Sequence, residues 1–297
     1  MVLEHLFPED WLEQKGRYAF ILGVGYSVIA ILIASILFPS DPALVAVAFT
    51  SMLLLPELYK IFSIEERQES MEKHMSMGAL WRDDIEIVRI YVFLFLGILL
   101  TYSIGTMLLP GLQTNDLFRE QLEIRLGEGF AGHAIAGSVF GSSFFRLFFE
   151  LLSNNFLVLI ACFILALLTG DGAIFLITWN ASVWGTIFGF TAKTAASFSG
   201  QSPFYVFGLI MMVVFPHMML EAMSYFLAAI SGSVISKDVI LEEFASERFM
   251  EVFGFNLYLL VFGLIFLVLG ALVEAFVLEN VGIYNEIIKQ SFLALGK

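Results

Sequence analysis

The 297-residue chain contains a single cysteine, Cys162, and only 14% of its residues are charged. One cysteine excludes an internal disulfide and a cysteine metal cluster, and its place in an apolar run predicts a packing residue. The sequence also lacks a Gly-x-x-x-x-Gly-Lys loop for nucleotide phosphates. Residues 1–17 are polar and acidic, whereas a cleavable signal has a basic start and an apolar core. The first apolar segment is therefore expected to remain as an anchor.

What the chain has in excess is apolar residues: 59% are hydrophobic and the mean hydropathy is +0.87. This balance is far from that of a soluble domain and predicts an integral protein of the cell membrane. The formal net charge of −13 arises mostly from a few short loops and the N-terminus. Acidic ends of this kind argue against nucleic acid as a partner and against docking on anionic lipid. The expected partners are the lipid bilayer and other membrane proteins.

Apolar stretches long enough to cross a bilayer, about 20 residues each, recur along the chain. The predicted fold is an all-α polytopic bundle of about seven transmembrane helices plus an interfacial amphipathic helix. The spans are expected at residues 18–38, 43–62, 90–109, 144–168, 173–190, 203–235 and 253–278. Pro56 should kink or end the second span. The seventh contains Glu274 near its far end.

The chain divides into four regions. These are an N-terminal acidic segment with a transmembrane hairpin (1–62), a charged extramembrane helix (63–89), a transmembrane core (90–280) and a C-terminal tail (281–297). Residues 63–89 carry mixed charges at helical spacing, which is typical of a solvated helix. Residues 114–143 are first amphipathic and then rich in glycine and alanine, which predicts an interfacial helix and a close-packing turn. The distribution of basic residues favours a cytoplasmic N-terminus.

The sixth apolar block, residues 203–235, is too long for one straight crossing, and Pro216 divides it near the middle. It is either a tilted, kinked span or two half-helices that meet inside the membrane. Seven crossings would place the C-terminus outside, whereas a split block would reverse this. A turn between the fourth and fifth spans contains Gly170 and Gly172, which predicts a tight antiparallel hairpin.

Ionisable and amide side chains inside these apolar runs are the strongest indication of a special site. A carboxylate at the membrane centre costs roughly 2.5 to 3.5 kcal/mol, so a compensating environment is required. His217 and Glu221 lie four residues apart and share a helical face, as do Glu150 and Asn154. The simplest packing has the two polar stripes facing each other. The predicted intramembrane cluster comprises Glu150, Asn154, Asn155, Asn180, His217 and Glu221, with helix breaks or turns at Pro216, Gly170 and Gly172.

Catalytic patterns are incomplete in this sequence. His217 and Glu221 lack the third ligand of a His-Glu-x-x-His zinc site, and Asp171 lacks a second aspartate within a span. Serines beside glycines, such as Ser142 and Ser199, arise easily in a membrane protein rich in small residues. The sequence therefore predicts a non-enzymatic protein with no catalytic residue, metal site or cofactor.

Several of these residues together form a recognisable pattern: Asn154 and Asn155, Gly170 and Gly172, Asn180, and Pro216, His217 and Glu221. Over about residues 90–278 the chain resembles the stage II sporulation protein M family of multispan membrane proteins. It departs from the family at Ala181 and Met218, where glycines are usual. In spore formers the resemblance implies a membrane scaffold for partners that remodel peptidoglycan. Relatives also occur in organisms that do not sporulate, including archaea, so this role does not carry over directly.

Two functions from different classes therefore stay open, of which the first is the predicted one and the second the alternative. The first is a scaffold or anchor for membrane and envelope proteins, in which the polar cluster holds the bundle together. The second is a channel or transporter with a polar midplane site, in which His217 is a natural proton-coupled element. A water-filled cavity touching His217 and Glu221 would favour transport, whereas dry side chains bonded to Asn154 or Asn155 would remove its main support. A third interpretation is a permease-like subunit of a larger exporter. Separately, the glycine-rich helix faces are compatible with a homo-oligomer.

Overall fold

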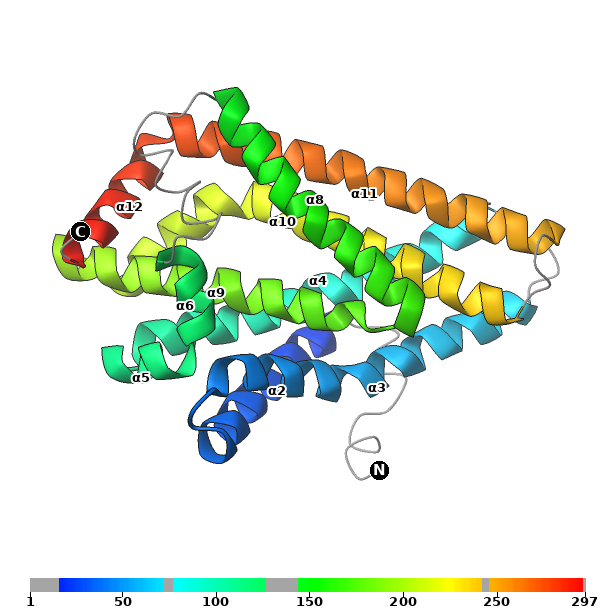
Figure 1. Cartoon of the computed structure of the whole chain (residues 1–297), viewed down its shortest axis with the longest axis horizontal. Helices are drawn as coiled ribbons and strands as arrows, with labels where there is room; N and C mark the ends of the chain where they lie inside the picture. The colour runs from blue at the N-terminus through cyan, green and yellow to red at the C-terminus, as the bar shows by residue number, and fades with distance from the viewer. Residues whose placement is uncertain (1–15, 72–76, 127–143, 242–245, 296–297) are drawn as a thin grey trace.

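The computed structural model describes residues 16–71, 77–126, 144–241 and 246–295, and these form helices and no strands (Figure 1). The helices are α2 (Gly16–Leu37), α3 (Pro42–Met71), α4 (Met77–Leu108), α5 (Gly111–Leu117), α6 (Arg119–Leu126), α8 (Phe144–Thr169), α9 (Ala173–Ser199), α10 (Pro203–Leu241), α11 (Glu247–Asn280) and α12 (Gly282–Ala294). The predicted all-α fold is confirmed.

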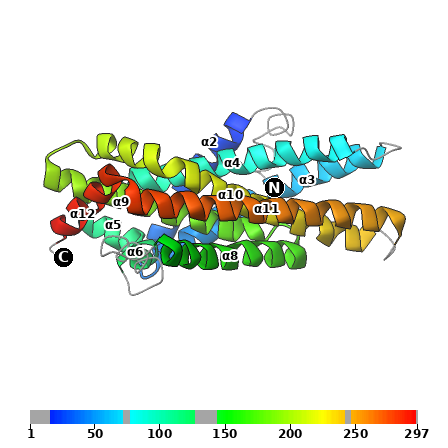
Figure 2. The ribbon, with the colours of Figure 1, turned by 90° about the horizontal axis from the view of Figure 1, so that it is seen from above.

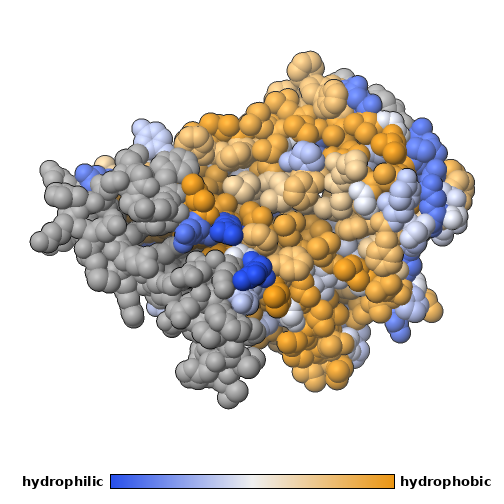
Figure 3. Space-filling view, turned by 180° about the vertical axis from the view of Figure 1, so that it is seen from behind, coloured by the Kyte–Doolittle hydropathy of each residue, from blue (hydrophilic) through white to orange (hydrophobic). Residues whose placement is uncertain are grey.

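Seven helices in the described part of the chain are long and apolar enough to span a membrane. Their spans are Gly16–Leu37, Pro42–Tyr59, Ile85–Leu108, Phe144–Thr169, Ala173–Ser199, Pro203–Lys237 and Phe249–Asn280. Figures 1 and 2 show that the long helices run mainly along the longest axis of the molecule. Hydrophobic residues cover most of the described surface in the view from behind, and hydrophilic residues gather along the right edge and beside the grey atoms (Figure 3). This is the pattern expected of a bundle surrounded by lipid.

Proline, serine and glycine mark the ends of these helices. Pro42 and Pro203 occupy the first positions of α3 and α10, where a missing N–H costs no helical hydrogen bond. The Ser246 hydroxyl accepts a hydrogen bond of 3.1 Å from the Phe249 N–H and so caps α11. Gly170 and Gly200 have φ values of 78° and 72°, a left-handed conformation that ends α8 and α9.

Helix α9 occupies the centre of the bundle, and α8 lies at its periphery. In an apolar stretch of 18 residues within α9, 67% of the residues are buried, against 22% in the corresponding stretch of α8. α9 contacts α4, α10 and α12, whereas α8 packs mainly on α10 and α11. A central α9 and a peripheral α8 leave room between them for the site described below.

Small residues allow α4 and α9 to approach closely. A Cβ atom at Gly189 would lie 2.6 Å from the Ser103 carbonyl oxygen, and one at Gly185 would meet the Leu99 carbonyl oxygen. The Ser103 hydroxyl also donates to the Gly185 carbonyl at 2.9 Å. The Gly-x-x-x-Gly spacing in α9 is thus used for helix packing, as in other membrane bundles.

The two prolines inside the spans do not end their helices. α3 continues through Pro56 to Met71, and α10 is one helix of 39 residues that contains Pro216. Transmembrane helices tolerate proline because neighbouring groups can satisfy the carbonyl that it leaves unpaired. Of the two arrangements open for residues 203–235, the structure has the single span.

Further helical segments lie beyond the predicted spans. α3 and α4 continue past their apolar parts into the charged segment, whose residues 72–76 lie outside the described residues. The segment expected to be interfacial contains α5 and α6, and its residues 127–143 also lie outside the described part. The expected C-terminal tail contains α12, in which Ile287 and Ile288 are buried and the Ser291 hydroxyl lies 2.6 Å from that of Thr194 in α9.

Candidate functional site

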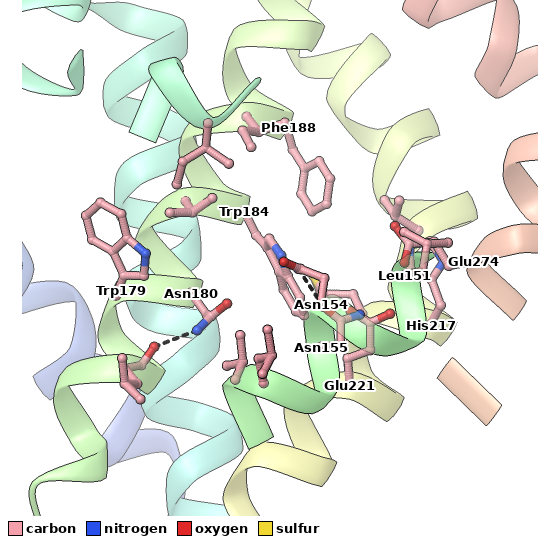
Figure 4. Close-up of a pocket in the computed structure, with 18 of the residues that line it drawn as sticks. Leu151, Asn154, Asn155, Trp179, Asn180, Trp184, Phe188, His217, Glu221 and Glu274 are labelled. Atoms are coloured by element: carbon pink, nitrogen blue, oxygen red, sulfur yellow. Dashed lines mark hydrogen bonds between the residues drawn. The ribbon is translucent and has the colours of Figure 1, made fainter. Parts of the chain in front are cut away.

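A cavity of about 580 Å³ lies between the central and peripheral helices and is lined by residues of α6, α8, α9, α10, α11 and α12. Its polar and charged lining residues are Asn154, Asn155, Asn180, His217, Glu221 and Glu274. Aromatic side chains line it as well: Trp179, Trp184, Phe188 and Tyr284. Figure 4 shows the aromatic residues of α9 on one side and the acidic residues on the other.

His217 and Glu221 project from one face of α10, one helical turn apart. Their side chains are 5% and 3% exposed, so both are buried in the protein. Neither His217 Nδ1 nor Glu221 Oε1 has a hydrogen-bond partner. Buried polar atoms are normally satisfied, and each exception requires an explanation. Here both groups border the cavity, so water or a solute within it can supply the missing partners.

The asparagines come from two helices. On α8, the Asn154 amide donates to Asn155 Oδ1 at 3.3 Å, and Asn155 lies against the Glu221 carboxyl group. On α9, Asn180 Nδ2 donates to the Leu176 carbonyl at 2.8 Å, and Figure 4 shows its amide oxygen on the cavity side. The amide groups therefore contribute polar atoms to the cavity from opposite walls.

Glu274 of α11 adds a second carboxyl group, which contacts that of Glu221. A glycine makes this contact close: a Cβ atom at Gly270 would lie 2.9 Å from Glu221 Cγ. α10 and α11 can thus approach each other just where the two acidic side chains meet. Like charges repel strongly in a medium of low dielectric constant, so two ionised groups at this distance require a compensating cation or proton.

The aromatic side chains of the cavity come mainly from α9. Trp179, Trp184 and Phe188 of α9 line the cavity, and the Trp184 ring packs edge-on against Phe95 of α4 at 5.6 Å between ring centroids. Because α9 is the most buried span, these rings are held by the core of the bundle. The site therefore combines a fixed aromatic wall with an acidic one.

Five of the six residues predicted to form the polar cluster line the cavity. The exception is Glu150, whose carboxylate is paired with Arg146 Nε at 2.8 Å and which is not among the lining residues of the described chain. Pro216 lies immediately before His217 within α10, without breaking the helix. Gly170 and Gly172 form the α8–α9 turn, in which Asp171 accepts a hydrogen bond of 3.1 Å from Ser233.

Glu274 and the two tryptophans were not predicted as site residues. Glu274 had the same signal as Glu221, a carboxyl group inside an apolar span, and Gly270 precedes it by one helical turn. For Trp179 and Trp184 no comparable signal exists, because an aromatic side chain within an apolar run carries no charge that would mark it as part of a site. The positions of the two missing family glycines, Ala181 and Met218, are buried within regular helices.

Chemically, the cavity can bind a solute through charge, amide hydrogen bonds and aromatic faces. No serine, threonine or cysteine is among its described lining residues, so it offers none of these three common nucleophiles. Within the described part of the chain, no three histidine, cysteine, aspartate or glutamate residues are grouped to hold a metal ion.

Comparison with known proteins gives one family. Curated proteins and solved structures yield no significant match. The sequence pattern of stage II sporulation protein M matches residues 28–277, which extends further toward the N-terminus than the motifs alone indicated and includes most of the first hairpin. The matched region covers all or part of each of the seven apolar spans, which make this a multi-pass membrane protein. The chain belongs to the stage II sporulation protein M family.

Proposed function

We propose that the protein is a non-enzymatic transporter or channel whose solute occupies the cavity between α8 and α9. The observation that carries this proposal is the pair His217 and Glu221, whose unpartnered atoms are buried and border the cavity. An unsatisfied buried polar group costs about 1–3 kcal/mol. A polar solute that fills the cavity can form hydrogen bonds with these atoms. It thereby removes the cost of their burial, and this gain contributes to the affinity of the cavity for the solute.

Transport is also supported by the depth and the access of the site. Polar residues inside membrane spans commonly mark a solute pathway, and transporters bind their solutes near the bilayer midplane. Two cavity-lining residues of α8, Asn154 and Leu157, are exposed, and Leu157 is 69% exposed. The cavity is therefore reachable from outside the bundle along α8.

The test is solute flux from proteoliposomes that contain the purified full-length protein. Vesicles are loaded with a defined mixture of inorganic cations, organic cations, anions and neutral solutes, and efflux is followed by mass spectrometry. At least one solute should leave faster than from protein-free vesicles. Glu221→Gln should slow that efflux at least tenfold, which corresponds to about 1.4 kcal/mol.

The matched control is Glu150→Gln, which removes a carboxylate from outside the cavity and should leave the efflux unchanged. Both variants should elute from size exclusion as the wild type does. Efflux equal to that of empty vesicles for every solute, or equal efflux from the wild type and Glu221→Gln, would contradict a transport function.

A second candidate function, a scaffold for other membrane proteins, is favoured by the shape of α3 and α4. α3 extends twelve residues beyond its apolar span, from Tyr59 to Met71, and α4 begins eight residues before its own, from Met77 to Ile85. Helices that project past the apolar belt offer a docking surface for a partner, and the projecting sequence is rich in charge.

The scaffold is tested by replacing residues 60–84 with a glycine-serine linker of equal length. If this segment docks partners, proteins that co-purify with the wild type from native membranes should be lost, while solute flux is retained. An unchanged set of co-purified proteins would exclude the segment as the docking surface.

A further inference from the structure

The charge of the cavity indicates which class of solute it accepts. Its described lining residues include two carboxyl groups, from Glu221 and Glu274, and no lysine or arginine. The other titratable groups near the pair are His217 and Tyr225 of α10 and Tyr284 of α12, and Cys162 of α8 lies near Tyr225. None of these is a permanent cation. An anionic solute would be repelled, whereas a cation would supply the charge that the carboxyl pair lacks.

The size of the cavity exceeds the needs of a bare inorganic ion. About 580 Å³ lies within the roughly 300–1,000 Å³ that pockets for small organic molecules occupy. A desolvated metal or alkali ion would also require several converging oxygen ligands, whereas the rings of Trp179, Trp184 and Phe188 occupy a large part of the lining that α9 provides. The solute must therefore present apolar surface as well as charge.

Aromatic faces opposite carboxyl groups are the combination that recognises ammonium ions. A cation within about 6 Å of a tryptophan ring gains about 0.5–2 kcal/mol, and quaternary ammonium groups are bound in this way. Figure 4 shows Trp179 and Trp184 of α9 on one side of the pocket and Glu274 on the other, with Asn154 and Asn155 drawn between them. An alkylammonium group placed there contacts the rings with its alkyl carbons and the Glu221–Glu274 pair with its charge.

We propose that the cavity binds an organic ammonium cation, with the carboxyl pair of Glu221 and Glu274 as its counter-charge and Trp179 and Trp184 as its aromatic wall. This inference rests on the proposed function and names its substrate class. The ammonium group has two sources, a free soluble cation or the headgroup of a zwitterionic lipid, because the cavity is reachable along α8 at Leu157.

The experiment measures binding rather than flux. The full-length protein is placed in nanodiscs of phosphatidylglycerol, which carries no ammonium group, and titrated with radiolabelled choline. The competitor is 3,3-dimethylbutan-1-ol, a neutral isostere that has the shape of choline without its positive charge. Choline should bind saturably, and the isostere should compete at least tenfold more weakly. Nanodiscs of phosphatidylcholine form the second arm, in which a headgroup in the site would block choline.

Variants then locate the site. Glu221→Gln and Glu274→Gln should each weaken choline binding at least tenfold, while Glu274→Asp, which keeps the charge, should lose less. Trp184→Leu should also weaken binding, and Glu150→Gln should not. Each variant is compared by size exclusion and thermal melting, so that loss of folding is recognised.

The outcomes separate this inference from the transport function. Equal competition by the isostere, binding that survives both glutamine variants, or no ammonium binding in either lipid would overturn the ammonium assignment. Flux of a different solute would then leave the transporter intact. Choline binding without flux would instead keep the binding site and remove transport.

Discussion

At the scale of single residues, Lys193 of α9 illustrates how a charge is accommodated within an apolar span. Its ammonium group donates to the carbonyl oxygens of Thr106, at 3.3 Å, and Leu109 at the end of α4. The Thr106 carbonyl would normally accept from residue 110, but Pro110 has no N–H to donate. Carbonyls at a helix C-terminus also carry partial negative charge, so Lys193 satisfies them and ties α9 to α4.

Replacing Lys193 with methionine should therefore destabilise the protein. The loss of hydrogen bonds to a charged donor, with buried carbonyls left unpaired, should lower the free energy of unfolding by about 1–3 kcal/mol. Unfolding in mixed micelles by titration with dodecyl sulfate, followed by circular dichroism, measures this change. Lys193→Arg keeps the charge and should retain most of the stability; an unchanged midpoint for the methionine variant would disprove the capping role.

Only some of the residues that line the cavity could be predicted, because spacing within one helix does not show which partner each side chain meets. Helical spacing correctly grouped His217 with Glu221, but it also grouped Glu150 with Asn154. Arg146 precedes Glu150 by four residues, and this ion-pair spacing decided where the Glu150 side chain lies. Glu274 could not be assigned to the site because its contact with Glu221 depends on how α10 and α11 cross, which no spacing within one helix reveals.

At the scale of helices, the contact between α4 and α9 depends on two glycines. Gly185 and Gly189 face the α4 backbone without space for a side chain, and Ser103 adds a hydrogen bond between the helices. Since lipid tails are as apolar as leucine, close packing and such hydrogen bonds, rather than a hydrophobic driving force, hold two helices together in a membrane.

Gly189→Leu should separate α4 from α9 and destabilise the bundle. Overpacking a well-packed interface costs about 1–3 kcal/mol, and here the clash is with backbone, which cannot move aside. The matched control is Gly208→Leu on α10, where an added Cβ atom meets nothing within 4 Å. Melting of both variants in detergent compares them, and equal loss of stability would show that the α4 contact is not responsible.

The positions of the helices along the sequence were easier to predict than which helices pack against one another. Apolar length alone identifies the spans, because every backbone group in lipid must be bonded within its own helix. Length and Pro216 could not decide between one helix and two, since the answer depends on the helices packed around residues 203–241. Helix α12 was missed because its sequence is too polar for a span, and contacts with α9 hold it in place.

At the scale of the whole molecule, the order of the seven spans fixes which connections share a side of the membrane. Successive spans alternate in direction, so the α2–α3 and α9–α10 connections lie together. The beginning of α2 and the α8–α9 turn lie on the opposite side. The cytoplasmic position of the N-terminus remains a prediction from the basic residues.

Single cysteines test this arrangement in intact cells. Because Cys162 is fully buried, Cys162→Ala supplies an unreactive background. With a membrane-impermeant maleimide, Ser40→Cys and Gln201→Cys should react directly, whereas Arg17→Cys and Thr169→Cys should react only after the membrane is permeabilised. The reverse pattern would invert the orientation, and a split within either pair would contradict the seven-span order.

The middle of α9 packs against backbone on one side and borders the cavity on the other. Substitutions should therefore be tolerated less often on α9 during evolution than on surfaces that face lipid. Positions such as 185 and 189 accept little beyond glycine. On the outer faces of α8 and α11, by contrast, leucine, isoleucine and phenylalanine can replace one another at little cost, since lipid imposes no particular shape. Divergent descendants of this sequence should therefore resemble one another most along a single helix, and a new solute preference would arise most readily from changes on α8.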